Sequence, residues 1–256
     1  MASKKRISPH MNVLFVTSRQ EKPSFRLRVA IYFPYLVQQG VSFQIFTTHK
    51  GWIHRVLLPF KAGHFDLCFI QKKLLHPLEL RLLKKFAKKI IFDFDDAIVF
   101  QDHGESRPSL QKAFNLMAQE SDLVICGNAY LKRLIPSSTK TILLPTPVDT
   151  EKIFPLEKET PFFKKGLGWL GSSSTLPYFL NNANTWRTIA QKKDLCFHII
   201  SSQFPMLPFS FQFFKWHEQL ENIQLNSCVI GLNPLPDNPF TRGKCAYKIL
   251  QYQAAG

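Results

Sequence analysis

Lys89-Ile90-Ile91-Phe92-Asp93-Phe94-Asp95-Asp96 is the stretch of sequence that decides the fold class. Its apolar residues follow one another without polar alternation, which is typical of a strand buried on both faces of a parallel sheet. Ligands bind at the carboxyl ends of the strands in open α/β sheets. We therefore expect at least one of Asp93, Asp95 and Asp96 to face a ligand. The alternative is that Asp93 and Asp96 cap the next segment and pair with nearby lysines.

Comparable apolar runs recur through residues 11–147, with helical patterns between them. The expected strands are Met11–Thr17, Val41–Thr47, Asp66–Gln71, Lys89–Asp93, Leu123–Cys126 and Thr141–Leu144. The expected helices are Phe25–Gln39 with a kink at Pro34, Pro77–Lys88, Ser109–Ala118 and Asn128–Ile135. This alternation predicts a doubly wound parallel sheet, which makes residues 11–147 a Rossmann-like domain.

Prolines and charged residues interrupt the pattern over residues 148–163, which we interpret as a linker between two domains. The alternation then restarts. Strands are expected at Leu167–Leu170, Leu195–Ile200 and Ser227–Leu232, and helices at Pro177–Ala190 and over residues 241–256. Residues 164–256 thus hold about half of the elements of a second Rossmann-like domain. The expected fold class is α/β with two Rossmann-like domains, the second incomplete.

The composition is strongly basic, with 33 lysines and arginines against 18 aspartates and glutamates and a formal net charge of +15. This charge favours nucleic acid, phosphate-bearing ligands or an anionic membrane surface as a partner. No apolar run approaches the ~20 residues of a membrane span. Residues 1–10 are expected to be a disordered basic tail rather than a signal peptide, which makes the cytoplasm the expected location. The five cysteines lack metal-ligand spacing and are expected to be buried, reduced thiols.

Three cations, Arg242, Lys244 and Lys248, lie where the last expected helix begins, after the strand Ser227–Leu232. The free N–H groups and the positive dipole end of a helix N-terminus favour a bound phosphate. The sequence therefore predicts a phosphate site at the start of the closing helix.

The turn after the strand Leu167–Leu170 is a second candidate for phosphate binding. Gly171 lets the backbone approach a ligand, and the hydroxyls from Ser172 to Thr175 can donate to phosphate oxygens or cap the next helix. The turn matches neither the dinucleotide fingerprint nor a P-loop. Helix capping is the simpler interpretation of this turn when it is taken alone.

The segment from Lys72 to Lys89 combines seven cations with a single acid, Glu79. Leucines and Phe86 recur at helical spacing among these charges. A basic amphipathic helix of this kind can lie on an anionic lipid surface. The alternative is a core-packing helix with a solvated lysine face.

In their order along the chain, these features resemble the retaining, nucleotide-sugar-dependent glycosyltransferases of the GT-B fold, called glycosyl transferases group 1 and similar to family 4. The resemblance covers residues 11–256. Its most specific segments are Phe65-Asp66 with Gln71-Lys72, Phe92 to Ala97, Ser121 to Val124, Pro145 to Asp149, Gly168 to Ser172 and the closing helix. Pro145 to Asp149 looks like the group's "P-N-G-V-D" turn between acceptor and donor domains, with Thr146 and Pro147 replacing the usual Asn and Gly.

The closing helix is similar to the group's "K-x-x-E-Y-x-A-x-G" segment, matched by Lys248, Tyr252, Ala254 and Gly256. The resemblance implies a donor diphosphate site formed by Gly171, Ser172, Arg242, Lys244 and Lys248. It also implies that Gln251, in place of the usual acid, holds the nucleotide ribose. Asp95 and Asp96 are the candidate catalytic residues. No metal or other cofactor is implied, because fixed cations and helix N–H groups stabilise a departing diphosphate.

The expected function is transfer of a sugar, with retention, from a nucleotide-diphosphate donor to a glycan or lipid acceptor. We expect a hexosyltransferase-like enzyme, cytoplasmic and peripheral at a membrane. Because the group's donor domain continues past A-x-G, we also expect either truncation or a second polypeptide that completes the domain.

Two alternatives to this function stay open. One is an inactive relative that binds an anionic glycan or lipid without turnover. The other is a basic nucleic-acid-binding protein, which is less favoured because no stacking motif or nucleic-acid module accompanies the basic residues.

Overall fold

The computed structural model describes residues 10–51, 55–156, 166–191 and 195–256, which divide into two compact units. The first unit runs to Thr146 and includes Asn238–Cys245, and the second comprises Pro147–Asp237 and Ala246–Gly256. Asn238–Cys245 therefore packs with the first unit, although it lies in the range 164–256 expected for the second domain. The predicted tail, apart from His10, and residues 157–163 of the predicted linker lie outside the described residues.

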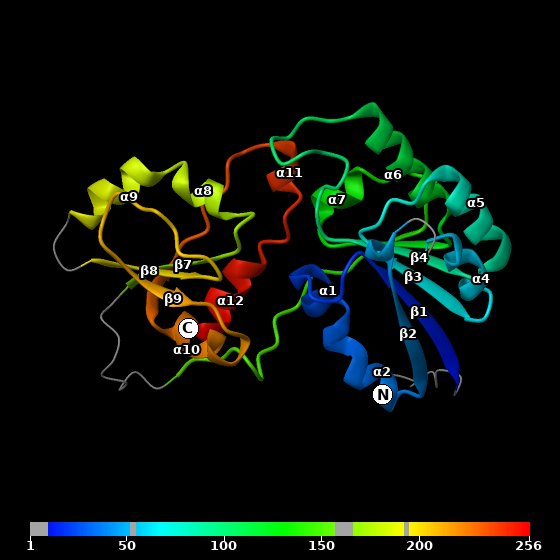
Figure 1. Ribbon diagram of the computed structural model, residues 1–256, viewed down its shortest axis with the longest axis horizontal. Helices are drawn as coiled ribbons and strands as arrows, with labels where there is room; N and C mark the ends of the chain where they lie inside the picture. The colour runs from blue at the N-terminus through cyan, green and yellow to red at the C-terminus, as the bar shows by residue number, and fades with distance from the viewer. Residues whose placement is uncertain (1–9, 52–54, 157–165, 192–194) are drawn as a thin grey trace. The chain divides into compact units, whose positions relative to one another are not determined.

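The first unit is built on a six-stranded parallel sheet in the order β2-β1-β3-β4-β5-β6 (Figure 1). Its strands are β1 (Met11–Thr17), β2 (Val41–Thr47), β3 (Leu67–Gln71), β4 (Ile90–Phe94), β5 (Leu123–Cys126) and β6 (Thr141–Leu143). Phe92 of β4 lies in register between Ile70 of β3 and Val124 of β5. All six predicted strands are confirmed, with bounds that differ by one residue at most.

Both faces of this sheet are buried, as the unbroken apolar runs predicted. Leu14 and Val16 of β1 belong to one core, and Val13 and Phe15 to the core on the opposite face. The helices α1 (Pro23–Arg28) and α2 (Phe33–Gln38) cover the Val13 face. The Leu14 face is covered by α4 (Leu58–Ala62), α5 (Pro77–Phe86), α6 (Pro108–Glu120) and α7 (Ala129–Arg133).

The predicted long helix Phe25–Gln39 is instead three short pieces, α1, the 3₁₀ turn η1 (Ala30–Tyr32) and α2. Pro34 lies in the first turn of α2 rather than at a kink. A proline is tolerated there because the first N–H groups of a helix have no intrahelical acceptor. The short helix α4 and the 3₁₀ turn η2 (Thr48–Lys50) were not predicted.

The second unit has a smaller parallel sheet of four strands in the order β10-β7-β8-β9. Its strands are β7 (Gly166–Gly171), β8 (Cys196–Ser201), β9 (Phe211–Lys215) and β10 (Cys228–Gly231). One face packs against α8 (Leu176–Leu180) and α9 (Ala183–Ala190), and the other against α10 (Glu221–Asn226) and α12 (Tyr247–Ala255), as Figure 1 shows. The sequence did not predict β9, α10 or the 3₁₀ turn η3 (Glu218–Leu220).

The closing segment is two helices rather than the single one expected. The short helix α11 (Pro239–Arg242) is capped by Asn238, whose side chain accepts a 2.9 Å hydrogen bond from the Thr241 N–H. Ala246 then adopts a left-handed conformation with φ of 50° before α12 begins at Tyr247. A right-handed helix cannot continue through a left-handed residue. As a result, only Lys248 of the three predicted cations lies in the closing helix.

Two further expectations concern the whole chain. No helix among the described residues is long and apolar enough to cross a membrane. The five cysteines are all free. Cys68 and Cys126 are buried, as predicted, whereas Cys196, Cys228 and Cys245 are only half-buried.

Candidate functional site

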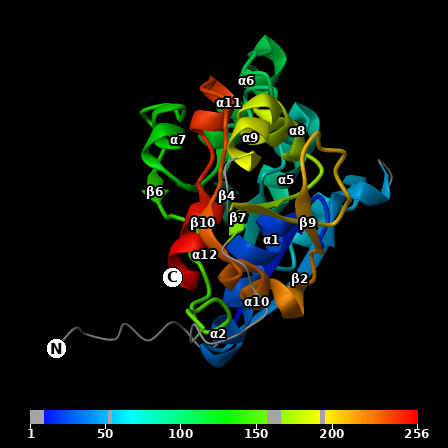
Figure 2. The same cartoon turned by 90° about the vertical axis from the view of Figure 1, so that its left-hand side faces the viewer.

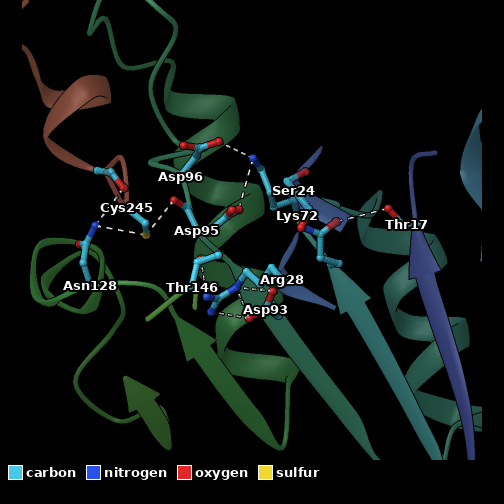
Figure 3. Close-up of polar contacts among 12 residues, drawn as sticks. Thr17, Ser24, Arg28, Lys72, Asp93, Asp95, Asp96, Asn128, Thr146 and Cys245 are labelled. Carbon is cyan, nitrogen blue, oxygen red and sulfur yellow. Dashed lines mark hydrogen bonds and ion pairs between the residues drawn. The ribbon is translucent and has the colours of Figure 1, made fainter. Parts of the chain in front are cut away.

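Asp93 is a buried structural anchor and does not face solvent. It is 2% exposed, and the Arg28 guanidinium of α1 donates to its carboxylate through Nε (2.9 Å to both oxygens) and Nη2 (2.7 Å to Oδ1). Arg28 Nη1 also donates to Thr146 Oγ1 (3.0 Å) and to the Leu144 carbonyl (2.8 Å) (Figure 3). One arginine thus joins α1, β4 and the chain that leaves β6.

The charge state of Asp93 follows from two opposing effects. Burial raises the pKa of Asp93 to about 6, and the Arg28 guanidinium limits the rise by stabilising the carboxylate. Asp93 is therefore ionised at neutral pH because Arg28 is present.

Asp95 and Asp96 follow β4, and both carboxylates lie next to the same cation, the ammonium group of Lys72. Lys72 Nζ lies 3.4 Å from Asp95 Oδ1 and forms an ion pair with Asp96 Oδ2. Lys72 is at the end of β3 in a left-handed conformation, φ 53°, and its N–H donates to the Asp93 carbonyl at 2.8 Å. This conformation is uncommon for a residue with a side chain, and it directs the lysine toward the two acids (Figure 3).

The two acids are half-buried and differ from Asp93 in accessibility. Burial raises the pKa of Asp95, Lys72 opposes the rise, and the neighbouring Asp96 adds to it. Asp95 Oδ1 is buried and lies 3.4 Å from Lys72 Nζ, its ion-pair partner. The two half-buried carboxylates lie at the carboxyl edge of a parallel sheet, which is where ligands of open α/β sheets bind.

The segment Asn238–Cys245 packs onto this same edge of the first unit. Cys245 Sγ donates to the Asp95 carbonyl (3.2 Å), and Asn128 Nδ2 donates to the Gly243 carbonyl (3.0 Å). Gly127 makes room for the contact, since a Cβ at this position would lie 2.3 Å from Cys245 Sγ. The backbone around Asp95 is therefore fixed by residues about 150 positions later in the chain.

Arg242 and Lys244 belong to this segment and hence to the first unit. Arg242 is exposed at the end of α11, and Lys244 Nζ lies 4.8 Å from the centre of the Phe240 ring. The structure does not gather these two cations with Lys248 at the start of one helix. Their role as diphosphate ligands stays a prediction.

The turn after β7 is the centre of a polar site in the second unit. Ser172 is exposed, and its hydroxyl lies 2.9 Å from that of Ser174. At Gly171 an added Cβ would lie 2.2 Å from the Trp169 ring, so only glycine fits between this ring and the turn. The Ser172 carbonyl accepts from the N–H of Thr175 at 3.0 Å, which closes the turn before α8.

Lys248 of α12 reaches this turn from the far end of the sequence. Its Nζ donates to Thr175 Oγ1 at 3.2 Å and lies 5.0 Å from the centre of the buried Trp169 ring. The aromatic face attracts the ammonium group and helps to hold it in place. A fixed cation, several hydroxyls and a glycine turn therefore meet at the carboxyl end of a central parallel strand.

Tyr252 fixes α12 on the sheet and so determines where Lys248 lies. Its hydroxyl accepts from the Leu170 N–H (2.8 Å), with the Gly168 carbonyl 3.3 Å away as an acceptor. Gly231 permits the contact, because a Cβ there would lie 2.2 Å from the Tyr252 ring. Figure 2 shows α12 beside β7 and β10.

Gln251, the predicted ribose ligand, is on the same helix but is 3% exposed. Its side chain is therefore buried rather than presented to solvent. The ribose role of Gln251 stays a prediction.

Several contacts of the two sites were not predicted from the sequence. The pairing of Arg28 with Asp93 and the ring of Trp169 under Lys248 join residues 65 or more positions apart. The contact of Lys72 with the aspartates could have been predicted, because Lys72 directly follows the strand that precedes the one ending in the aspartates.

The architecture is shared with known structures. The crystal structure of Anabaena Alr3699/HepE in complex with UDP and glucose superposes with a TM-score of 0.61 at 13% identity, covering 91% of this chain and 77% of HepE. This chain has the GT-B fold.

Two further solved structures are similar in the same way. The complex of HepE with UDP-glucose matches with a TM-score of 0.60 at 13% identity, over 87% of this chain and 73% of HepE. The spinosyn forosaminyltransferase SpnP matches with a TM-score of 0.51 at 12% identity, over 87% of this chain and 74% of SpnP. No protein-family description matches the sequence, and no curated protein matches it.

Proposed function

We propose that this chain is a glycosyltransferase that takes a sugar from a nucleoside diphosphate donor and transfers it to a glycan or lipid acceptor. The observation that carries the proposal is the placement of Lys248 on Thr175 and Trp169 at the turn after β7. In open α/β sheets this edge is where nucleotides bind. The GT-B likeness to HepE, solved with UDP and with UDP-glucose, supports the same assignment.

The chemistry of the site suits a departing diphosphate. When the bond between the sugar and the donor breaks, negative charge develops on the β-phosphate. Lys248 is positioned to stabilise this charge, and Ser172 and Thr175 supply hydroxyl donors at the same turn. Because Tyr252 and Trp169 fix the lysine in advance, the protein needs little reorganisation as the charge develops.

The acceptor side of the proposal is assigned to the first unit. Asp95 and Asp96 orient the acceptor hydroxyl, with Lys72 holding both carboxylates in place. We further propose that transfer retains the anomeric configuration, with the departing phosphate itself helping to remove the acceptor proton. Analysis of the product anomer by NMR tests this part separately.

Titration calorimetry with UDP and with GDP tests the donor site. We expect at least one of them to bind, and Lys248→Ala to weaken its binding by roughly 10- to 100-fold, the usual range for a charge-assisted hydrogen bond. Lys215→Ala is the matched control, because Lys215 is an exposed lysine at the end of β9 in the same unit. Arg242→Ala and Lys244→Ala are titrated in the same series.

Two results would count against the proposal. If neither nucleotide binds, the chain has no donor site. If Lys248→Ala and Lys215→Ala weaken binding equally, the nucleotide does not depend on the turn after β7.

A further inference from the structure

The outer face of α5 carries a stripe of exposed apolar side chains. Leu78, Leu82 and Phe86 are spaced by four residues and therefore lie on one face of the helix. They are 61%, 44% and 37% exposed, whereas Leu80 and Leu83 on the opposite face are buried. The helix thus buries one apolar face in the core and presents a second one to solvent.

The neighbouring helix α4 extends this stripe. The Phe60 ring of α4 packs against the Phe86 ring with their centres 4.9 Å apart. Phe60 is 53% exposed, and Leu57, directly before α4, is 55% exposed. We call Leu57, Phe60, Leu78, Leu82 and Phe86 the α4–α5 patch. Figure 1 shows the two helices next to each other in the first unit.

The free cations of α5 lie beside the patch. Arg81 and Lys85 are three residues after Leu78 and Leu82, so they flank the stripe along one side. Both are exposed, and neither has an ion-pair partner among the described residues. These two side chains are free to contact an anionic surface that meets the patch.

Three other lysines, on α5 and directly after it, already have partners. Lys84 Nζ donates to the Glu120 carbonyl (2.6 Å), Lys88 pairs with Asp66 (2.9 Å) and Lys89 pairs with Asp122 (2.9 Å). Among the described residues of α5, Arg81 and Lys85 are therefore the cations without a hydrogen bond or ion pair, and both lie beside the apolar stripe.

The patch itself carries no uncompensated acid among the described residues. Glu79, the acid of α5, forms an ion pair with Arg55 and accepts from the His76 N–H at 2.9 Å. A second copy of the chain docked symmetrically through this patch would bring Arg81 and Lys85 of both copies to one interface, with no unpaired acid of the patch to offset their charge. Such like-charge contacts are unfavourable, so self-association is a poor match for this surface.

We propose that the α4–α5 patch docks the protein onto an anionic lipid bilayer. Leucine and phenylalanine side chains enter the boundary between headgroups and acyl chains, and Arg81 and Lys85 contact the lipid phosphates. The headgroup region of an anionic bilayer favours this arrangement, in which cations lie along one side of half-exposed apolar residues. Docking requires neither a nucleotide nor a sugar, so its test is independent of the proposed transferase activity.

Co-sedimentation with vesicles tests the docking. We compare vesicles of phosphatidylcholine with vesicles of equal parts phosphatidylcholine and phosphatidylglycerol, using the full chain. Binding is expected to the anionic vesicles and to weaken as salt is added. The double variant Arg81→Gln/Lys85→Gln should bind roughly 30-fold more weakly, from about a fivefold loss for each cation near the surface.

Two control variants separate docking from general effects. Lys88→Gln/Lys89→Gln removes the same net charge from two paired lysines that lie beyond α5, and we expect its loss to be below about threefold because these lysines do not flank the apolar stripe. Leu78→Asn/Leu82→Asn should weaken binding by at least about tenfold. Val229→Asn/Ile230→Asn alters two comparably exposed apolar residues of the second unit and should have no effect.

The proposal is overturned by any of four outcomes. The first is that the protein fails to bind anionic vesicles, and the second is that it binds neutral vesicles equally well. The third is that the two cation variants lose affinity to the same extent, which would show a response to net charge alone. The fourth is that the chain forms a dimer in analytical ultracentrifugation that Leu78→Asn/Leu82→Asn abolishes, which would assign the patch to a second copy. Circular dichroism of each variant confirms that the chain is folded.

Discussion

Removal of Arg28 should destabilise the first unit in a strongly pH-dependent way. Arg28→Met deletes the guanidinium that makes three hydrogen bonds to Asp93, while Asp93 stays 2% exposed. A buried ion pair broken on one side costs about 3–5 kcal/mol, because the remaining charge has lost its partner. We expect a loss of that size in the free energy of unfolding at pH 7.5.

The pH dependence follows from the raised pKa of Asp93. Burial raises it to about 6 in the folded wild type, above the ~3.9 of an unfolded chain, so the folded state binds this proton more tightly. This contribution to stability is therefore full below pH 4 and is lost as the pH rises through 6. Without Arg28 the folded pKa rises further and the loss extends above pH 6. At pH 5, where both proteins hold the proton, the cost of Arg28→Met should shrink to about 1–2 kcal/mol of lost hydrogen bonding.

Urea unfolding followed by circular dichroism at pH 5.0 and 7.5 measures both values. The double variant Arg28→Met/Asp93→Leu should recover most of the loss, since it removes both charges from the core. Arg107→Met is the control, because the Arg107 side chain is exposed and, among the described residues, hydrogen-bonds only to Gln101. It should change stability by less than about 0.5 kcal/mol. A cost of Arg28→Met that is equal at the two pH values would show that the charge of Asp93 does not cause the loss. Additive effects of Arg28→Met and Asp93→Leu in the double variant would show the same.

Three further predictions rest on other contacts. Lys72→Met should cost about 2 kcal/mol of unfolding free energy, because Asp95 and Asp96 lose their shared cation. The control Lys88→Met, in an exposed pair, should cost less than about 1 kcal/mol. Equal costs of the two variants in urea unfolding would contradict this prediction. Burial lowers the pKa of His198, so the unfolded state takes up the proton first as the pH falls. The free energy of unfolding should therefore decrease below pH 6.5 by up to about 1.4 kcal/mol per pH unit. If the same pH dependence is measured for His198→Gln, His198 is not its cause. Tyr252→Phe leaves the Leu170 N–H without its acceptor and should cost about 1–3 kcal/mol while weakening nucleotide binding, whereas undisturbed binding would show that Tyr252 does not position Lys248.

The strands of the first sheet were predictable because a strand buried on both faces needs an unbroken run of apolar residues, which the sequence shows directly. Runs such as Ile90 to Phe92 have no polar residue to face solvent, and their spacing leaves room for crossover helices. The helices were less predictable. Phe25 to Gln39 has continuous helical spacing, but the chain divides at Val29, whose φ and ψ of −120° and −58° are not helical.

The second sheet was harder to predict because its signals are ambiguous. Phe211–Lys215 forms β9 from a short aromatic run, and only Ser210 separates this run from the preceding aromatic residue, Phe209. Its burial depends on neighbours such as Phe197 and Phe209, which only the folded sheet brings together. Sequence periodicity alone cannot reveal this pairing.

The candidate sites were predicted by residue type but not by grouping. The aspartates after β4 and the hydroxyl turn after β7 were identified because each follows a strand. Arg242, Lys244 and Lys248 are close in sequence, which predicts a single cluster, yet the left-handed Ala246 divides them between two units. The partners of Asp93 and Lys248 come from residues 65 and 73 positions away, a distance over which local patterns carry no information.

Hydrogen exchange measured by mass spectrometry in the presence of UDP, and separately of GDP, shows whether a nucleotide binds at the turn after β7. A bound nucleotide should slow amide exchange in residues 166–176 and 246–256, where β7, its turn and α12 meet. Lys248→Ala should abolish this protection at the same nucleotide concentration, and Lys215→Ala should leave it intact. Absence of protection with either nucleotide, or protection confined to the first unit, would contradict the assignment of the donor site.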